Sequence, residues 1–436
     1  MSRELKDSGI PWIGEIPKEW TIGRMKNYFH LHGRIGWNGL RSEEFEEESY
    51  AYLVTGQDFV AKDIDWKKCY QIRKERYDED EYIQLKEGDI LVTKDGTIGK
   101  VAIVSNLDKP ACLNSGIFVI KQYEPKHYNS NYLYWLLVAP LLKTYNDFIN
   151  LGGTTIIHLY QNVFERMPLV LPLLAEQQAI ADFLDRKCAE VDEMIGLQEQ
   201  IIEELKAYKQ SVITEAVTKG LNPDAPMRDS GIEWIGEIPE HWEVKRLKNI
   251  FKLKTGTTPD GFDIVNEDSE IIPWFTPSDI SDDCCELHQS ERKLYKSEVG
   301  EIELFPKGSL MFVGIGASAG KLGYSHILGY SNQQITALIP DNCNGKYYYY
   351  FLIADRKRLR DNAFFTTLPI INNGYLSQNK IVYPPIAEQQ AIVDYLDEKC
   401  ADIDSLIQTK QAKIDSLKEY KKSIIYEYVT GKREVE

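Results

Sequence analysis

The sequence AEQQAI occurs twice, at residues 175–180 and 387–392, and each copy opens a long run of helix-forming residues. The first run meets no proline until Pro223, and the second run contains none. In both runs apolar residues recur at alternating spacings of four and three, which indicates a coiled-coil helix with one narrow apolar seam. The chain is therefore predicted to contain the same long helix twice.

Polar residues interrupt each seam at the same two places in both helices. A seam of this kind needs a cover, and two repeats related by a pseudo-twofold axis would cover each other in antiparallel directions. We therefore expect an antiparallel coiled coil; the alternative is that each helix packs separately on its neighbouring domain. The predicted seam runs through Val191, Ile195, Gln198, Ile202, Leu205, Lys209, Val212 and Ala216 in the first helix, and through Ile403, Ile407, Lys410, Ile414, Leu417, Lys421, Ile424 and Tyr428 in the second.

A second repeated block precedes each helix at a distance. Residues 7–17 read DSGIPWIGEIP, and residues 229–239 read DSGIEWIGEIP. These copies lie 222 residues apart, whereas the AEQQAI copies lie 212 apart, so the segments between the fixed blocks differ in length. The predicted division is a first head at 1–175, a central helix at 176–220, a second head at 221–387 and a C-terminal helix at 388–436.

Each head contains a strand, a glycine-rich loop and a second strand, at residues 86–104 and 305–323. An aromatic helix is predicted to follow, at 132–148 in the first head and 347–364 in the second. Each head is therefore expected to be a mixed α/β domain. The predicted fold class is α/β (α+β), with two heads in a pseudo-twofold repeat separated by two long helices.

The second glycine loop, FVGIGASAGKLG at residues 312–323, partly matches known cofactor loops. A P-loop would need glycine in place of Ile315 and Ser or Thr in place of Leu322. The segment FVGIG also resembles the cofactor loop of adenine methyltransferases, but the first head carries VTKDG there, and the Asn/Asp-Pro-Pro-aromatic motif of those enzymes is missing. Since no set of catalytic side chains recurs in both heads, the sequence favours a reader over a catalyst.

Composition narrows the class of protein. Of the 436 residues, 43% are hydrophobic and 27% charged, as in an ordinary globular protein. The sequence lacks the apolar core of a signal peptide and any apolar stretch of about 18 residues, so we expect a cytoplasmic protein with no membrane partner. The seven cysteines form no C-x-x-C pair and no histidine has zinc-ligand spacing, so neither a disulfide framework nor a metal site is predicted.

The formal net charge of −16 opposes binding to nucleic acid. Both heads are close to charge balance, however, which allows local basic faces, and an acidic chain could bind DNA with the help of a basic partner. The seam from Val191 to Ala216 would be about 39 Å long, close to one turn of duplex DNA at about 34–36 Å. Two readers held at that distance would suit a bipartite DNA site.

Four features resemble the specificity subunit of type I restriction-modification systems over the whole chain. They are Glu-Ile-Pro followed by Trp, the GDIL segment leading to a G-x-x-G-K loop, AEQQAI opening a long helix, and the linker NPDAPMRDSG at residues 222–231. The resemblance implies that the heads are target-recognition domains, each reading half of a bipartite asymmetric site in double-stranded DNA. It also implies that the chain itself is not an enzyme.

The same resemblance implies the partners. Two copies of a modification methyltransferase subunit would bind, and restriction/translocase subunits would join them. S-adenosylmethionine, ATP and Mg²⁺ are expected on those subunits, with no cofactor bound by this chain. The exposed faces of the long helices are the expected docking surface for the modification subunit, because the helices are what repeats.

The candidate DNA contacts lie in the heads, where Lys and Arg would position phosphates and Thr and Ser would read base edges. Each could equally be a turn former, a strand residue or a solvated charge. The predicted contacts are Thr93, Lys94, Thr97, Lys100, Thr154, Thr155, Ser318, Lys321, Arg356, Arg360, Thr366 and Thr367.

Two other classes of function compete with this interpretation. A self-contained adenine-specific DNA methyltransferase would need a second catalytic motif that the sequence does not show. A purely structural coiled-coil adaptor would give two divergent heads no purpose.

Overall fold

The computed structural model describes residues 3–34, 40–123, 127–149, 158–258, 271–281, 285–295, 303–365 and 368–435. The chain divides into two compact units, a first unit of residues 1–199 with 412–436 and a second unit of residues 200–411. Each unit contains a head together with one part of each long helix. No described helix is both long and apolar enough to cross a membrane.

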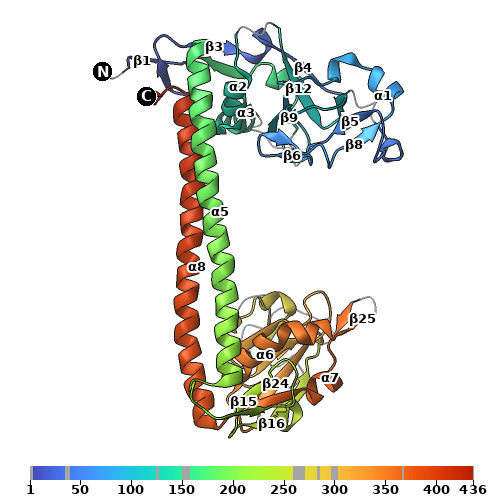
Figure 1. The fold of residues 1–436 in the computed structure, drawn as a ribbon, viewed down its shortest axis with the longest axis vertical. Coiled ribbons are helices and arrows are strands. Elements are labelled where there is room, and N and C mark those ends of the chain that lie inside the picture. The colour runs from blue at the N-terminus through green and yellow to red at the C-terminus, as the bar shows by residue number, and fades with distance from the viewer. Residues whose placement is uncertain are drawn as a thin grey trace. The chain divides into compact units, whose positions relative to one another are not determined.

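The first unit is built on a four-stranded antiparallel sheet in the order β10-β9-β12-β4 (Figure 1). A smaller sheet, β11-β5-β8, pairs β11 and β5 in parallel. The strands are β1 (Leu5–Asp7), β2 (Glu15–Pro17), β3 (Thr21–Arg24), β4 (Phe29–His32), β5 (Ala51–Val54), β6 (Phe59–Val60), β7 (Asp63–Ile64), β8 (Tyr70–Ile72), β9 (Ile90–Thr93), β10 (Val101–Ile103), β11 (Ala111–Leu113), β12 (Ile117–Gln122) and β13 (Pro168–Leu171). The α-helices of this head are α1 (Lys74–Asp78), α2 (Ser130–Val138), α3 (Pro140–Ile149) and α4 (Gln161–Phe164).

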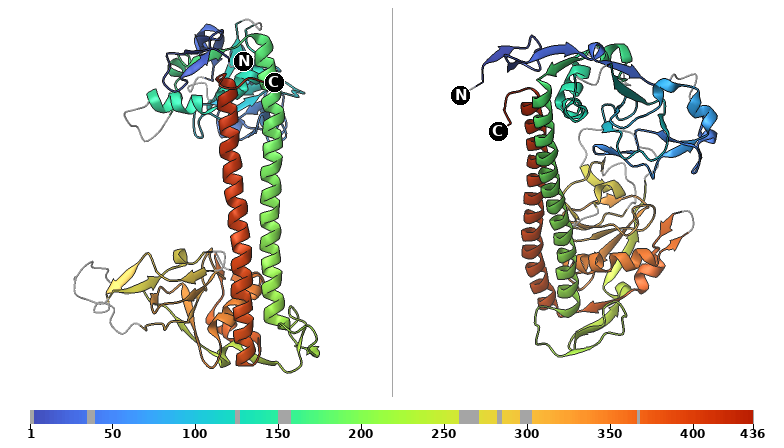
Figure 2. Two further views of the ribbon diagram at one scale, coloured as in Figure 1. Left: turned by 90° about the vertical axis from the view of Figure 1, so that its left-hand side faces the viewer. Right: turned by 45° about the horizontal axis from the view of Figure 1, so that its top comes forward.

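The second unit repeats this plan with one more strand in its main sheet, in the order β17-β24-β21-β22-β19. Figure 2 shows its strands beside α6. The strands are β14 (Met227–Asp229), β15 (Glu237–Pro239), β16 (Glu243–Arg246), β17 (Phe251–Thr255), β18 (Ile271–Phe275), β19 (Cys285–Leu287), β20 (Lys293–Tyr295), β21 (Leu310–Val313), β22 (Leu322–Ser325), β23 (Tyr330–Ser331), β24 (Ile335–Pro340), β25 (Phe364–Phe365), β26 (Pro369–Ile370) and β27 (Lys380–Tyr383). Its head also contains α6 (Gly345–Asp361) and α7 (Asn373–Gln378).

The aromatic helix predicted for residues 132–148 differs from the observed structure. It is divided into α2 and α3, and the second begins at Pro140. Proline has no backbone N–H to donate and its ring clashes with the preceding turn, so one straight helix cannot continue through this position. The second head has no proline in this segment, and α6 is continuous over 17 residues.

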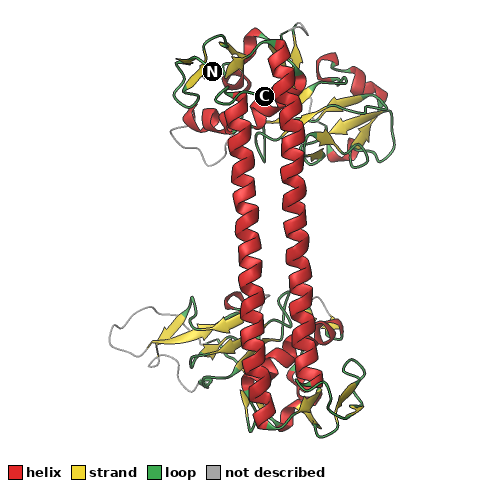
Figure 3. Ribbon diagram, turned by 60° about the vertical axis from the view of Figure 1, so that its left-hand side comes forward, coloured by secondary structure: helices red, strands yellow, loops and turns green. Residues whose placement is uncertain are grey.

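Two long helices, α5 (Leu174–Lys219) and α8 (Ile386–Val429), run through both units (Figure 3). Within the first unit the Phe183 and Tyr428 rings stack at 4.3 Å, and the Lys421 Nζ atom lies 2.6 Å from the Asp192 carboxylate. Because residues increase along one helix as they decrease along the other, the two helices are antiparallel here. In the second unit Lys209 contacts both oxygens of Asp404 at 2.7 Å.

The seam predicted from sequence faces inward. Its apolar members are buried or half-buried, while most residues between them are exposed. Lys209 and Lys421, two of the polar interruptions, occupy equivalent positions and bind equivalent aspartates on the facing helix. Ion pairs at such positions favour one alignment of the two helices over others. The eight apolar residues central to the predicted seam are Ile195, Ile202, Leu205, Val212, Ile407, Ile414, Leu417 and Ile424.

Each head packs its core against the end of one long helix and the start of the other. In the first unit Trp20 and Tyr132 are fully buried in a cluster that includes Val429 near the end of α8. The Tyr132 hydroxyl donates to the Val429 carbonyl at 3.2 Å. In the second unit the Tyr347 hydroxyl donates to the carbonyl of Val217, near the end of α5, at 2.8 Å. These bonds satisfy carbonyls that a helix leaves unpaired at its C-terminal end.

Candidate nucleic-acid interface

The AEQQAI block joins each head to the start of a long helix. In the first unit the buried Gln177 side chain accepts a hydrogen bond from the backbone N–H of Asn129 (2.9 Å) and donates one to the Pro172 carbonyl (3.1 Å). Gln178 accepts a bond from the Asn129 side-chain amide at 2.5 Å. Asn129 in turn caps α2 by accepting from the Tyr132 N–H.

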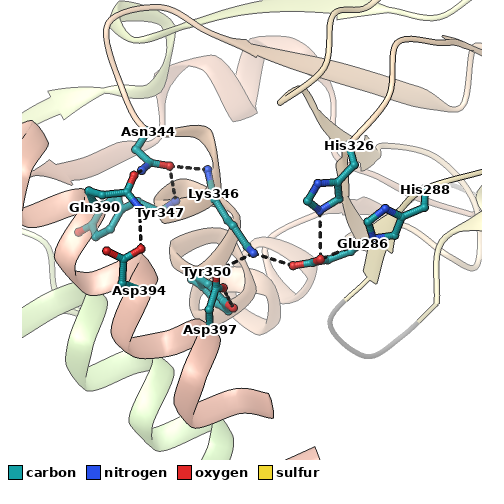
Figure 4. Close-up of polar contacts among 10 residues, drawn as sticks. All are labelled: Glu286, His288, His326, Asn344, Lys346, Tyr347, Tyr350, Gln390, Asp394 and Asp397. Atoms are coloured by element: carbon teal, nitrogen blue, oxygen red, sulfur yellow. Dashed lines mark hydrogen bonds and ion pairs between the residues drawn. The ribbon is translucent and has the colours of Figure 1, made fainter.

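The second unit repeats this joint atom by atom. Gln389 accepts from the Asn344 backbone N–H (2.8 Å) and donates to the Pro384 carbonyl (2.8 Å). Gln390 accepts from the Asn344 side-chain amide at 2.9 Å (Figure 4). We call these two sets of contacts the head–helix joints. Their repetition explains why the block recurs almost unchanged while the heads differ.

The tryptophan after each Glu-Ile-Pro belongs to the same joint. The Trp20 indole N–H donates to the Glu176 carboxylate at 2.8 Å, and the Trp242 indole N–H donates to Glu388 at 2.9 Å. Both glutamates lie in the first turn of their helix, where a negative charge is favoured by the helix dipole. In each unit the tryptophan that follows the Glu-Ile-Pro block is therefore in contact with the AEQQAI block.

The first glycine loop connects β9 to β10 and contains four of the predicted DNA contacts. Thr93 is 3% exposed; its hydroxyl donates to the Thr97 carbonyl (2.6 Å) and accepts from the Lys100 N–H (3.0 Å). Thr93 thus braces the loop from within rather than presenting its hydroxyl to solvent. Gly96 and Gly99 have φ values of +69° and +80°, a region that favours glycine.

The other three predicted residues of this loop differ in exposure. Thr97 and Lys100 are exposed. Lys94 is half-buried with its amine 4.8 Å from the centre of the Phe118 ring, and burial lowers the pKa of this amine. An open groove of about 880 Å³ lies beside the loop, and Lys143 of α3 lines it. Nothing in the sequence marks Lys143, because only folding brings α3 next to the loop.

The second glycine loop, which contains Ser318 and Lys321, lies against the part of α6 that carries Arg356 and Arg360. The Arg360 guanidinium donates to the Ala317 carbonyl at 3.4 Å. A Cβ atom added at Gly320 would lie 3.8 Å from both Arg356 and Arg360, so α6 lies directly against this loop. The backbone carbonyl of Ser318 accepts a hydrogen bond from the backbone N–H of Lys321 (3.1 Å), which closes the loop. Two residues of the loop and two of the helix thus lie on segments that are in contact, and we call these four the Arg/Lys cluster: Ser318, Lys321, Arg356 and Arg360.

Two pairs of predicted contacts, Thr154 with Thr155 and Thr366 with Thr367, lie outside the described residues. The two neighbouring cations of α6 have local partners: Lys357 pairs with Asp361 at 3.0 Å, and Arg358 binds Asp355 through two nitrogens at 2.6 Å. The DNA-contact assignments for the described residues stay predictions.

Comparison with known proteins places this architecture in a family. The model of the type I restriction modification DNA specificity domain matches the chain twice, over residues 17–207 and 239–419. The chain belongs to this family. Each match covers one copy of the internal repeat, so the chain carries two specificity domains in tandem.

Relatives of the specificity-domain family match along nearly the whole chain. The specificity subunit of the type I restriction enzyme MjaVIII from Methanocaldococcus jannaschii is 26% identical over 435 residues, which covers 96% of this chain and 93% of the relative. Among solved structures, a chain from work on complex assembly and conformational transition of the type I R-M system matches with a TM-score of 0.75 at 16% identity, over 96% of this chain and 99% of that chain. The HsdS subunit from Thermoanaerobacter tengcongensis matches with a TM-score of 0.54 at 17% identity, over 96% and 98%. Both structures share the fold of this chain.

Proposed function

We propose that this chain is the DNA-recognition subunit of a type I restriction-modification complex, in which each head reads one half of a bipartite asymmetric site in double-stranded DNA. One observation carries the proposal: equivalent head–helix joints hold two different heads. The glycine loops read VTKDGTIGK in one head and VGIGASAGK in the other, and the main sheets contain four and five strands. Different heads held by equivalent head–helix joints would read different DNA sequences.

The direct test exchanges one head. Residues 1–175 are replaced by the equivalent part of a relative, and methylated adenines are mapped by long-read sequencing in a host that also carries the modification subunit. We expect one half of the methylated motif to change while the other half stays. A motif that changes completely, or not at all, would contradict modular reading.

The long helices are proposed to dock two copies of the modification methyltransferase, to which restriction/translocase subunits are added. Exposed apolar residues at equivalent helix positions support two equivalent sites. Met194 and Tyr420 are exposed in the first unit, and their counterparts Leu406 and Tyr208 are exposed in the second. Native mass spectrometry should find two modification subunits per chain. The double variant Met194→Asp with Tyr420→Asp alters only the site in the first unit, so it should bind one modification subunit. A complex of any other stoichiometry would refute the two-site proposal.

For DNA recognition and methylation the chain is proposed to need no cofactor of its own, and it is proposed to act in the cytoplasm. S-adenosylmethionine, ATP and Mg²⁺ would be bound by the partner subunits. Purified chain mixed with labelled S-adenosylmethionine and DNA should transfer no methyl group until the modification subunit is added. Methyl transfer by the chain alone would favour the alternative, a self-contained adenine-specific DNA methyltransferase.

A further inference from the structure

Three potential metal ligands converge at the edge of the second head's main sheet (Figure 4). Strands β19 and β22 pair in parallel, with Leu287 opposite Ser325, and the backbone N–H of His326 donates to the Leu287 carbonyl at 2.9 Å. Glu286 is the middle residue of β19, and His288 directly follows the last residue of that strand. His326 immediately follows β22 and lies beside His288.

The geometry of the three side chains is compact. The His326 Nε2 atom is 3.0 Å from the Glu286 Oε2 atom, and the His288 Nε2 atom is 3.7 Å from the same oxygen. The two imidazole rings are nearly parallel, 8° apart in tilt with centroids 4.3 Å apart. One ligand atom from each of the three residues lies within 4.8 Å of the others. Both imidazoles thus approach the same carboxylate oxygen. His326 is within hydrogen-bond distance of it, and His288 is not.

We propose that Glu286, His288 and His326 form a binding site for a divalent transition-metal cation of the zinc type. Two imidazole nitrogens and one carboxylate oxygen are a donor set that Zn²⁺ accepts, with a water in the fourth position. Modest rotation of the stacked rings would turn both Nε2 lone pairs toward a shared ion. Glu286 and His288 are exposed and His326 is partly exposed, so an ion can reach the site from solvent.

Lys346 orients the carboxylate of Glu286. Its Nζ atom lies 2.8 Å from Glu286 Oε1, leaving Oε2 toward the histidines, and 2.8 Å from Asp397. Lys346 also forms an ion pair with Asp397. Its ammonium therefore keeps a counter-ion when a cation binds Glu286.

The site lies on β19, the additional strand in the main sheet of the second head. The four-stranded main sheet of the first head has no strand paired in the position of β19 among its described residues. A bound cation would tie β19 to β22 and so strengthen the edge of the sheet in this head. Metal binding at this edge is independent of the proposed DNA recognition and can be tested without DNA.

The experiment uses the full chain after removal of metal with a chelator. Zn²⁺ is titrated by calorimetry, and Co²⁺ replaces it for absorption spectroscopy. We expect one equivalent of tightly bound metal, a Co²⁺ spectrum of nitrogen and oxygen ligation, and a higher melting temperature with Zn²⁺. His288→Ala and His326→Ala should each weaken binding by about tenfold or more and abolish the thermal shift. Absence of stoichiometric binding to the unaltered chain would overturn the proposal.

Two controls separate this site from other sources of metal affinity. His30→Ala with His32→Ala removes the stacked histidine pair of the first head, whose rings contact Tyr123 and Tyr82, and should leave Zn²⁺ binding unchanged. Cys284→Ser with Cys285→Ser removes the thiols that precede Glu286 in the sequence, and binding should persist. Binding that survives the histidine variants but disappears with the cysteines would refute the site. Melting curves without metal show whether each variant is folded.

Discussion

At one position of each long helix, the two heads contact the same acceptor with different donors. Asp185 of α5 and Asp397 of α8 are equivalent positions, 212 residues apart. Asp185 accepts from the Trp135 indole N–H (2.8 Å), and Asp397 accepts from the Tyr350 hydroxyl (2.7 Å). The aromatic side chain thus changes while the contact is retained.

The lysine at each of these aspartates comes from a different part of its head. Lys62, between β6 and β7, binds Asp185 at 2.7 Å. Lys346, in the first turn of α6, binds Asp397 at 2.8 Å. The helices therefore fix where acceptors lie, and a head of different sequence can dock provided that it places a cation and a donor there. This division allows two heads of different structure on one symmetric scaffold.

The largest expected effect concerns the glutamines of the head–helix joints. Gln389→Ala would leave the Asn344 N–H and the Pro384 carbonyl without their partner in a site where Gln389 is fully buried. We expect local unfolding free energies in the second unit to fall by about 2–4 kcal/mol. Hydrogen exchange measured by mass spectrometry should locate the loss to that unit, and Gln177→Ala should produce the same loss in the first.

The exposed neighbour Gln390 provides the matched control. Its amide contacts Asn344 and Asp394 at the surface, so Gln390→Ala should cost well under half as much. Equal losses for the two substitutions would mean that the joint does not depend on the buried glutamine.

A smaller effect is expected from the tyrosine that bonds the end of a long helix. Tyr347→Phe removes a 2.8 Å hydrogen bond to the Val217 carbonyl inside a fully buried cluster, and should cost about 1–2 kcal/mol. Tyr132→Phe removes longer bonds, of 3.2 Å to Val429 and 3.3 Å to Val170, and should cost less. Unfolding monitored unit by unit would rank the two, and the reverse order would mean that the length of these bonds does not determine their contribution.

The two long helices were predictable from sequence because their signals are local. The seam repeats every three or four residues, and AEQQAI marks both helix starts, so α5 and α8 and their antiparallel pairing follow from the pattern. The contacts of Gln177 could not be predicted from the pattern, because they depend on where folding places Asn129. The break between α2 and α3 at Pro140 carried a readable signal, the proline itself, which the aromatic pattern obscured.

The heads were less predictable because their sites are made by sheet pairing. Glu286 and His288 meet His326 across strands nearly 40 residues apart, and no ligand spacing along the sequence reveals this. In the same way, the pattern of the first glycine loop selected Thr93, whose side chain is buried by the turn it stabilises. The grouping of Arg356 and Arg360 with the loop of Lys321 likewise needed the packing of α6.

Removing one cation of the Arg/Lys cluster should weaken DNA binding by about 1 kcal/mol. In the complex with the modification subunit, Arg360→Ala should lower affinity similarly for cognate and altered sites and reduce the salt slope by about one, as expected for a phosphate contact. Lys357→Ala on the same helix is the control, because Lys357 is 91% exposed and paired with Asp361. Fluorescence anisotropy at several salt concentrations would measure both, and equal effects would remove Arg360 from the interface.

The smallest expected effect separates the two equivalent ion pairs of the coiled coil. The Lys209 side chain is 12% exposed and that of Lys421 is 26%, while their partners Asp404 and Asp192 are 45% and 56% exposed. Solvent screens an ion pair more strongly as its exposure rises, so double-mutant cycles should give about 0.5–1 kcal/mol of coupling for Lys209–Asp404 and less for Lys421–Asp192. Both couplings should shrink in high salt. If Lys421–Asp192 proved the stronger pair, burial would not be what distinguishes these two otherwise symmetric contacts, and the alignment of the helices would depend chiefly on the first unit.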